Sequence, residues 1–285
     1  MRKTILILTA IFSFSSFAAA SQDTVLNRVN DSGKVRIGFT YNAPPMGYIN
    51  DSGKWTGFDL ALGHELAKRL GVKLQAVKVN DDTRIAFLAS GRIDLAIAHM
   101  SETRSRMQKI DFAFPPYLWT CKVFYARKGR FHSVGDLAGK RIGVAQGSNA
   151  FSAGQEEIAK YSNKPAKMVS FQNNADAFLA LKQNKIDAYT QDTPIIAAVA
   201  GKAGVDFAPV GKCFSPGLYG IGVPPNHKEW RTKVSFALQD IIKDGTYEHL
   251  YQHWFGTHGF SPLPVNARPR LPADAFGNMP LVLPN

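Results

Sequence analysis

Residues 84–98 read RIAFLASGRIDLAIA, in which a helical pattern is followed within a few residues by an apolar run. Arg84 to Ser90 predicts a helix, and Ile93 to Ala98 predicts a strand that is buried on both faces. A helix that leads directly into a buried strand is one step of an α/β fold.

Similar patterns precede and follow this stretch. Upstream, Val35, Ile37 and Phe39 alternate as one face of a strand, and residues 58–70 carry apolar side chains at four-residue spacing, which predicts an amphipathic helix ending near Gly71. Short buried strands separated by helices favour a mainly parallel sheet. The other strands are expected at 74–79, 141–145, 168–171, 186–190 and 218–223, and the other helices at 150–161 and 175–183.

Two segments of the chain resemble each other. Ala86-Phe87-Leu88-Ala89, followed by Ile93-Asp94, is echoed by Ala177-Phe178-Leu179-Ala180, followed by Ile186-Asp187. This echo favours two α/β lobes built on one plan.

The last part of the chain predicts two helices and a tail. Trp230 and Leu238 belong to the first helix, and Tyr251 and Trp254 to the second, each within an apolar set at helical spacing. Such sets are typical of core packing rather than of a ligand platform. Residues 259–285 are proline-rich, which predicts an extended tail.

The first twenty residues have the order of a secretory signal peptide. Arg2 and Lys3 precede an apolar stretch that is too short to anchor the chain in a bilayer, and small residues end at Ala20. We therefore expect residues 1–20 to be removed by cleavage after Ala20 and the mature protein to reach the periplasm.

The chain carries a formal net charge of +12. Its lysines and arginines are scattered without a dense basic run, so a nucleic-acid partner is not expected. A positive field that steers anionic solutes towards an exported protein is the simpler explanation of this charge.

Cys121 and Cys213 are the only cysteines of the sequence. An even number in an oxidising compartment permits one disulfide, and two buried free thiols are the alternative. Neither cysteine has a nearby Cys or His at metal-ligand spacing, so we expect no metal site and no cofactor.

A series of short motifs runs along about residues 33–258. The motifs are Gly33-Lys34-Val35-Arg36-Ile37-Gly38, Pro44-Pro45, Gly57-Phe58-Asp59, Gly91-Arg92-Ile93-Asp94-Leu95, Ser101 through Arg106, Asp111 through Tyr117, Asp136 through Lys140, Gly147-Ser148, and Ile186-Asp187-Ala188 with Asp192. In this order and spacing they resemble the family 3 extracellular solute-binding proteins, the polar amino-acid receptors of ABC importers. The pattern is most similar to that of the glutamate/aspartate-type receptors.

This resemblance implies a two-lobed, periplasmic-binding-protein-like α/β fold of type II, with a mainly parallel sheet flanked by helices in each lobe. Lobe 1 would comprise residues 34–120 and 219–258, and lobe 2 residues 121–218. The ligand would lie between them, at the carboxyl ends of the strands, and the lobes would close on it by a hinge motion. A Cys121–Cys213 disulfide is also expected, since both cysteines border strands that the family pairs near the hinge.

The resemblance also implies how an amino acid is bound. Arg106 would hold the α-carboxylate, because a planar guanidinium can bind both oxygens at once, and Ser101 would add hydroxyl and backbone contacts. Ser148 and Asn149, at the start of the next helix, would offer a second carboxylate contact. Asp192 matches the family's ammonium ligand. The alternatives are a solvated Arg106 and helix-capping roles for Ser148 and Asp192.

Selectivity rests on fewer residues. Arg84 matches an arginine that faces the ligand's side-chain carboxylate in the glutamate/aspartate-type receptors, which favours an acidic or small polar amino acid, although Asp81 could neutralise it. His99 stands where the family commonly has a small hydroxyl residue, and would either bond the ligand side chain or pack. Tyr41 is expected to stack against the ligand.

The sequence therefore predicts a monomeric periplasmic receptor that delivers its amino acid to the membrane permease of an ABC importer and has no enzymatic activity. One alternative is a dehydratase-type enzyme on the same scaffold, in which His99, Asp81 and Asp192 would do acid–base work. Another is an accessory or sensor protein that binds no free amino acid.

Overall fold

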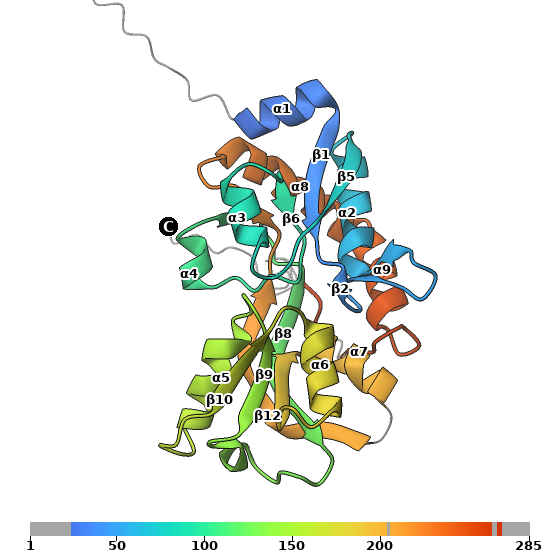
Figure 1. The fold of residues 1–285 in the computed structure, drawn as a ribbon. Helices are drawn as coiled ribbons and strands as arrows, with labels where there is room; N and C mark the ends of the chain where they lie inside the picture. Colours follow the sequence, from blue (N-terminus) through green and yellow to red (C-terminus); the bar gives the residue numbers. More distant parts are fainter. Residues whose placement is uncertain (1–23, 204–205, 264–266, 270–285) are drawn as a thin grey trace, which may run out of the picture.

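The computed structural model describes residues 24–203, 206–263 and 267–269, and this part of the chain forms two α/β lobes, one above the other in Figure 1. The predicted signal peptide with its cleavage after Ala20, and residues 270–285 of the predicted tail, lie outside the described residues. None of the helices in the described ranges is both long and apolar enough to cross a membrane.

Lobe 1 is built on a five-stranded sheet in the order β5-β1-β6-β13-β7. The neighbours β5, β1 and β6 are parallel, whereas β13 is antiparallel to both β6 and β7. A small antiparallel sheet, β2-β3-β4, lies in the sequence between β1 and the helix α2 (Phe58–Arg69). The bounds are β1 Lys34–Phe39, β2 Asn42–Ala43, β3 Gly47–Ile49, β4 Trp55–Thr56, β5 Lys73–Lys78, β6 Leu95–Ala96, β7 Asp111–Phe112 and β13 Gly222–Val223.

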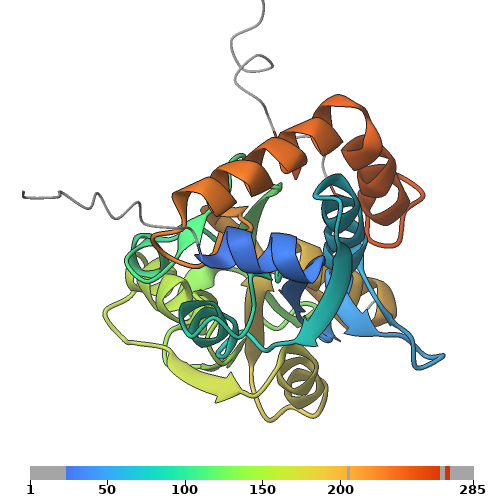
Figure 2. The same ribbon diagram turned by 90° about the horizontal axis from the view of Figure 1, so that it is seen from above.

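The side chains of lobe 1 form two core layers, because successive residues of a strand point to opposite faces. Leu95 and Ile97 join the layer that contains α2, α8 and α9, whereas Ala96 and Ala98 join the layer that contains α3. Seen from above, α8 and α9 lie along one side of the lobe, with α3 towards the other (Figure 2). The helices of this lobe are α1 Thr24–Ser32, α2 Phe58–Arg69, α3 Arg84–Ala89, α4 Arg104–Met107, α8 Lys228–Lys243 and α9 Thr246–Phe255.

Lobe 2 repeats this plan with a sheet in the order β10-β9-β11-β8-β12. The neighbours β10, β9 and β11 are parallel, and β8 is antiparallel to both β11 and β12. The elements are β8 Leu118–Arg127, a 3-10 helix at Val134–Leu137, β9 Arg141–Ala145, α5 Ala150–Ala159, β10 Lys167–Phe171, α6 Asn174–Lys182, β11 Ala188–Asp192, α7 Thr193–Ala203 and β12 Phe207–Tyr219.

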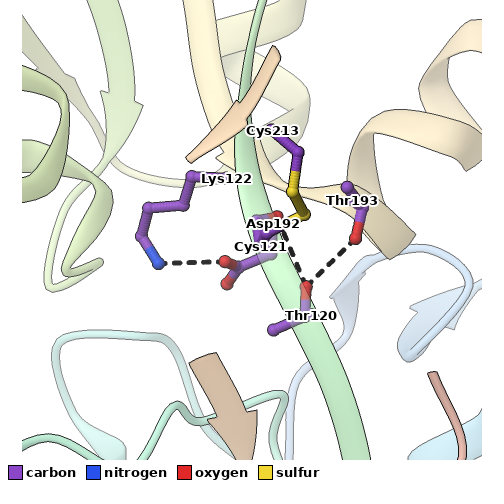
Figure 3. Close-up of a disulfide and its surroundings, with 6 residues drawn as sticks. All are labelled: Thr120, Cys121, Lys122, Asp192, Thr193 and Cys213. Carbon is purple, nitrogen blue, oxygen red and sulfur yellow. Dashed lines mark hydrogen bonds and ion pairs between the residues drawn. A yellow bond between two sulfur atoms is a disulfide. The ribbon is translucent and has the colours of Figure 1, made fainter. Parts of the chain in front are cut away.

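The strands β8 and β12 join the two lobes. They pair from Leu118 with Tyr219 at the lobe-1 end to Arg127 with Phe207 at the far end of lobe 2. The predicted disulfide between Cys121 and Cys213 is confirmed, and it links these two neighbouring strands (Figure 3). Where one lobe ends and the other begins along these strands stays a prediction, because both strands run on towards lobe 1.

Most predicted elements are found within two residues of their expected bounds, and the predicted core residues Trp230, Leu238, Tyr251 and Trp254 are buried. The single strand expected at 218–223 is wrong. Tyr219 ends β12 in lobe 2, and after Gly220 the chain enters the lobe-1 sheet as β13. An apolar run does not reveal a change of sheet, because both sheets bury their strands.

Candidate functional site

The predicted site residues lie where strands from both lobes reach their carboxyl ends. In lobe 1, Tyr41 follows β1, and His99 and Ser101 follow β6. In lobe 2, Ser148 follows β9 and Asp192 is the last residue of β11. These are the edges at which open α/β sheets bind ligands.

Arg106 connects the two lobes. It lies in α4, where the hydroxyl of Thr103 accepts a hydrogen bond from its backbone N–H. Its guanidinium donates to the carbonyl oxygen of Ser101 at 2.8 Å within lobe 1 and to that of Gly147 at 3.2 Å in lobe 2. The solvated alternative does not apply, since Arg106 is only 6% exposed.

The positive charge of Arg106 has no carboxylate partner among the residues that the structure describes. Burial, together with repulsion from Arg84, lowers the pKa of Arg106 to about 10, so the side chain is still a cation at neutral pH. A buried cation without a counter-charge favours a ligand that carries a carboxylate.

Gly147 is one point of contact between the lobes. Its φ is +79°, and a Cβ built on it would come within 2.6 Å of backbone atoms of Asp81 and Asp82 in lobe 1. The loop after β9 therefore touches the loop before α3. Glycine is required here both for its left-handed backbone and for its lack of a side chain.

Ser148 and Asn149 open helix α5. The hydroxyl of Ser148 accepts a hydrogen bond from the backbone N–H of Ala150, the first residue of α5, at 3.2 Å, although the N-cap position itself is held by Asn149. The same hydroxyl lies 3.4 Å from Oε1 of Gln191, to which it donates. Asn149 makes no side-chain capping bond. Contact of either side chain with a ligand carboxylate stays a prediction.

Asp192 has two buried side-chain partners, Lys122 and Tyr219. Lys122 on β8 is its cross-strand neighbour, and Nζ of Lys122 lies 3.0 Å from Oδ1 of Asp192. The hydroxyl of Tyr219 donates to Oδ2 at 2.9 Å. All three side chains are buried. Figure 3 shows Lys122 on one side of β8 and the Cys121–Cys213 disulfide on the other, as expected for successive residues of a strand.

Arg84 also has an internal partner. Its Nη1 lies 2.9 Å from Oδ1 of Asp81, and it donates to the carbonyl oxygen of Ala98. Nε2 of His99 lies 3.0 Å from the same Asp81 oxygen. The other ring nitrogen of His99, Nδ1, lies 3.3 Å from the hydroxyl of Thr40. Burial raises the pKa of Asp81, but the charges of Arg84 and His99 outweigh this and hold it below its usual range. Asp81 therefore neutralises Arg84, which was one of the two possibilities considered from the sequence. A contact between Arg84 and a ligand stays a prediction.

Ser101 and Tyr41 differ in how much of each side chain is available to a ligand. The buried hydroxyl of Ser101 has no hydrogen-bond partner among the described residues. The ring of Tyr41 is half-buried and has the ammonium of Lys78 at 5.6 Å from its centroid. Stacking of a ligand on Tyr41 would therefore use the opposite face of the ring.

Sequence reasoning missed several buried polar residues of this region. Asp59 accepts hydrogen bonds from the hydroxyl of Tyr117 at 3.0 Å and from the backbone N–H of His99 at 2.9 Å, and burial raises its pKa to about 6. Lys122 and Tyr219 were also missed. A lysine directly before the apolar residues 123–126 was a usable signal, because lysine is rarely buried without a partner.

The whole two-lobed region matches one protein family. Residues 35–257 match the bacterial extracellular solute-binding proteins, family 3. The chain belongs to this family. The resemblance seen in the motifs is therefore confirmed.

Similar proteins come from bacteria and from ancestral reconstruction. The chain is 28% identical over 251 residues to the L-cystine-binding protein TcyJ of Escherichia coli (strain K12), which covers 87% of this chain and 91% of that protein. It is 30% identical over 268 residues to the histidine-binding periplasmic protein of the same strain, which covers 90% and 97%. The solved structure of the ancestral amino acid-binding protein AncCDT-1, a precursor of cyclohexadienyl dehydratase, is 30% identical with a TM-score of 0.73, and covers 81% of this chain and 99% of that one. The predicted two-lobed α/β fold class is confirmed, with parallel and antiparallel neighbours in each sheet.

Proposed function

We propose that this protein is the receptor of an ABC importer, which captures a polar amino acid between its lobes as a monomer and delivers it to a membrane permease. The observation that carries the proposal is the buried, unpaired guanidinium of Arg106, which bonds to backbone carbonyls of both lobes. Membership of the solute-binding family and the amino-acid-binding names of its relatives support the same function.

The α-carboxylate of the ligand would bind Arg106 in place of one of the carbonyl contacts, with the free hydroxyl of Ser101 beside it. The ammonium group would bind the carboxylate of Asp192 in lobe 2. Because one ligand would then bind charged groups of both lobes, closure would be stable only with ligand present. An acidic amino acid is favoured over a basic one, since Arg106 is bonded to carbonyl oxygens and to no carboxylate among the described residues.

A thermal-shift screen of the mature protein against the common amino acids tests this proposal. A ligand at one hundred times its Kd should add about 2.7 kcal/mol to the free energy of unfolding. Small-angle scattering should then show a more compact particle for the same ligand. If no amino acid raises the melting temperature of protein freed from bound ligand by unfolding and refolding, the receptor function is wrong.

One contact keeps a second function under consideration. His99 and Asp81 lie 3.0 Å apart in a buried pair, which could serve in acid–base chemistry, and one similar structure is named as the precursor of a dehydratase. Asp81, however, is also bound to Arg84. Incubation with prephenate, followed by NMR, distinguishes the two: product formation would favour the enzyme.

A further inference from the structure

Lys122 is a fully buried cation with unused hydrogen-bonding capacity. Its ammonium group has three N–H donors, and within the described ranges Oδ1 of Asp192 is the only acceptor at hydrogen-bond distance. Each oxygen of Asp192 accepts one hydrogen bond, from Lys122 and from Tyr219 respectively, so each keeps one further acceptor position. Donors are therefore left over on the lysine, and acceptor positions remain on the aspartate for a ligand ammonium group.

The charges around Asp192 do not balance either. Burial lowers the pKa of Arg106, and the charges of Asp81 and Asp192 act in the opposite direction. Arg106 and Lys122 together carry two positive charges, and Asp192 supplies one negative charge. The remaining buried cation of this region, Arg84, is already matched by Asp81. Asp59, the third buried carboxylate here, is bonded to Tyr117 and to the backbone of His99 instead, so within the described ranges one of these cations has no carboxylate at ion-pair distance.

A zwitterionic amino acid would not correct this imbalance. Its carboxylate would neutralise Arg106, but its ammonium group would compete with Lys122 for Asp192 and leave two cations beside one carboxylate. A cationic amino acid would add a further charge. A ligand with a second carboxylate would supply the missing partner, because that group could accept from the free donors of Lys122 while the ammonium group binds Asp192.

We propose that Lys122 binds the side-chain carboxylate of the ligand, and that the protein therefore selects dicarboxylic amino acids of net charge −1. This inference rests on the proposed receptor function. The sequence predicted this role for Arg84. Arg84, however, is neutralised by Asp81, whereas Lys122 is bonded to Asp192, the residue proposed to bind the ligand's ammonium group.

Titration calorimetry on refolded, ligand-free mature protein tests the inference with ligands of equal length and different charge. Glutamate and aspartate should bind at least tenfold more tightly than glutamine and asparagine, and arginine should bind more weakly still. In Lys122→Gln the ratio of acid to amide affinity should fall at least tenfold. Lys128→Gln, at an exposed site just after the same strand, lowers the net charge equally and should leave the ratio unchanged.

The wild-type comparison needs no variant, so poor folding of Lys122→Gln would not prevent the test. Amides that bind as tightly as acids, or an unchanged ratio in a folded Lys122→Gln, would overturn this inference and leave the receptor function intact. Glutarate, which lacks the ammonium group, should bind at least tenfold more weakly than glutamate. Equal affinities for glutarate and glutamate would mean that the ligand's ammonium group does not bind Asp192, which would contradict the inference. Absence of binding by every amino acid would overturn the receptor function itself.

Discussion

Replacing Gly147 with alanine should weaken ligand binding more than it weakens folding. Its φ of +79° costs an alanine about 1–2 kcal/mol in any state of the protein that keeps this loop. The new Cβ would also come within 2.6 Å of backbone atoms of Asp81 and Asp82. Since these atoms are backbone, no side chain can rotate away, and one of the two loops must move.

Separation of the lobes relieves this contact, because it joins a loop of lobe 2 to a loop of lobe 1. The substitution therefore destabilises the closed arrangement selectively, and we expect at least a tenfold loss of affinity, or about 1.4 kcal/mol. Calorimetry with the best ligand of the thermal-shift screen measures this loss.

Gly129→Ala is the matched control for this experiment. Gly129 also lies in lobe 2 with a φ of +74°, but an added Cβ there meets nothing within 4 Å. This variant should lose similar stability and keep the wild-type affinity. The reasoning is refuted if Gly147→Ala binds as tightly as Gly129→Ala.

Three further predictions concern other residues. Arg106→Ala should lose about 2–5 kcal/mol of binding free energy by calorimetry, because the ligand carboxylate is left buried and unpaired, and an unchanged affinity would remove Arg106 from the site. Cys121→Ser/Cys213→Ser should lower the free energy of unfolding in urea by about 2–5 kcal/mol, since the disulfide closes a loop of 92 residues; an unchanged midpoint would contradict this. Burial raises the pKa of Asp59 to about 6, so between about pH 4 and pH 6 the folded protein keeps a proton that the unfolded chain has lost. Asp59 therefore lowers the free energy of unfolding as pH rises through this window. In urea denaturation at a series of pH values, Asp59→Asn should lack that fall, and free energies that change with pH in the same way for wild type and variant would contradict the prediction.

The helices and most strands were predictable from the sequence because they depend on near neighbours. The four-residue spacing within residues 58–70 placed α2 correctly, since an amphipathic helix needs only one face to be apolar. The motifs located the site at the strand ends by resemblance, and the oxidising compartment allowed the disulfide. The strand expected at 218–223 failed because it crosses from one sheet to another, which no local pattern records.

The partners of the charged residues were decided only by the tertiary structure. Lys122 and Asp192 are 70 residues apart in sequence and meet because β8 and β11 are antiparallel neighbours in register. Arg84 and Asp81 are close in sequence, yet only the fold turns both into the same buried space. The sequence, through its motifs, predicted that a ligand binds where strand ends of the two lobes meet. Strand order, register and burial decided which of the charged residues there pair with one another, because the interactions of a buried charge depend on its nearest partners in space.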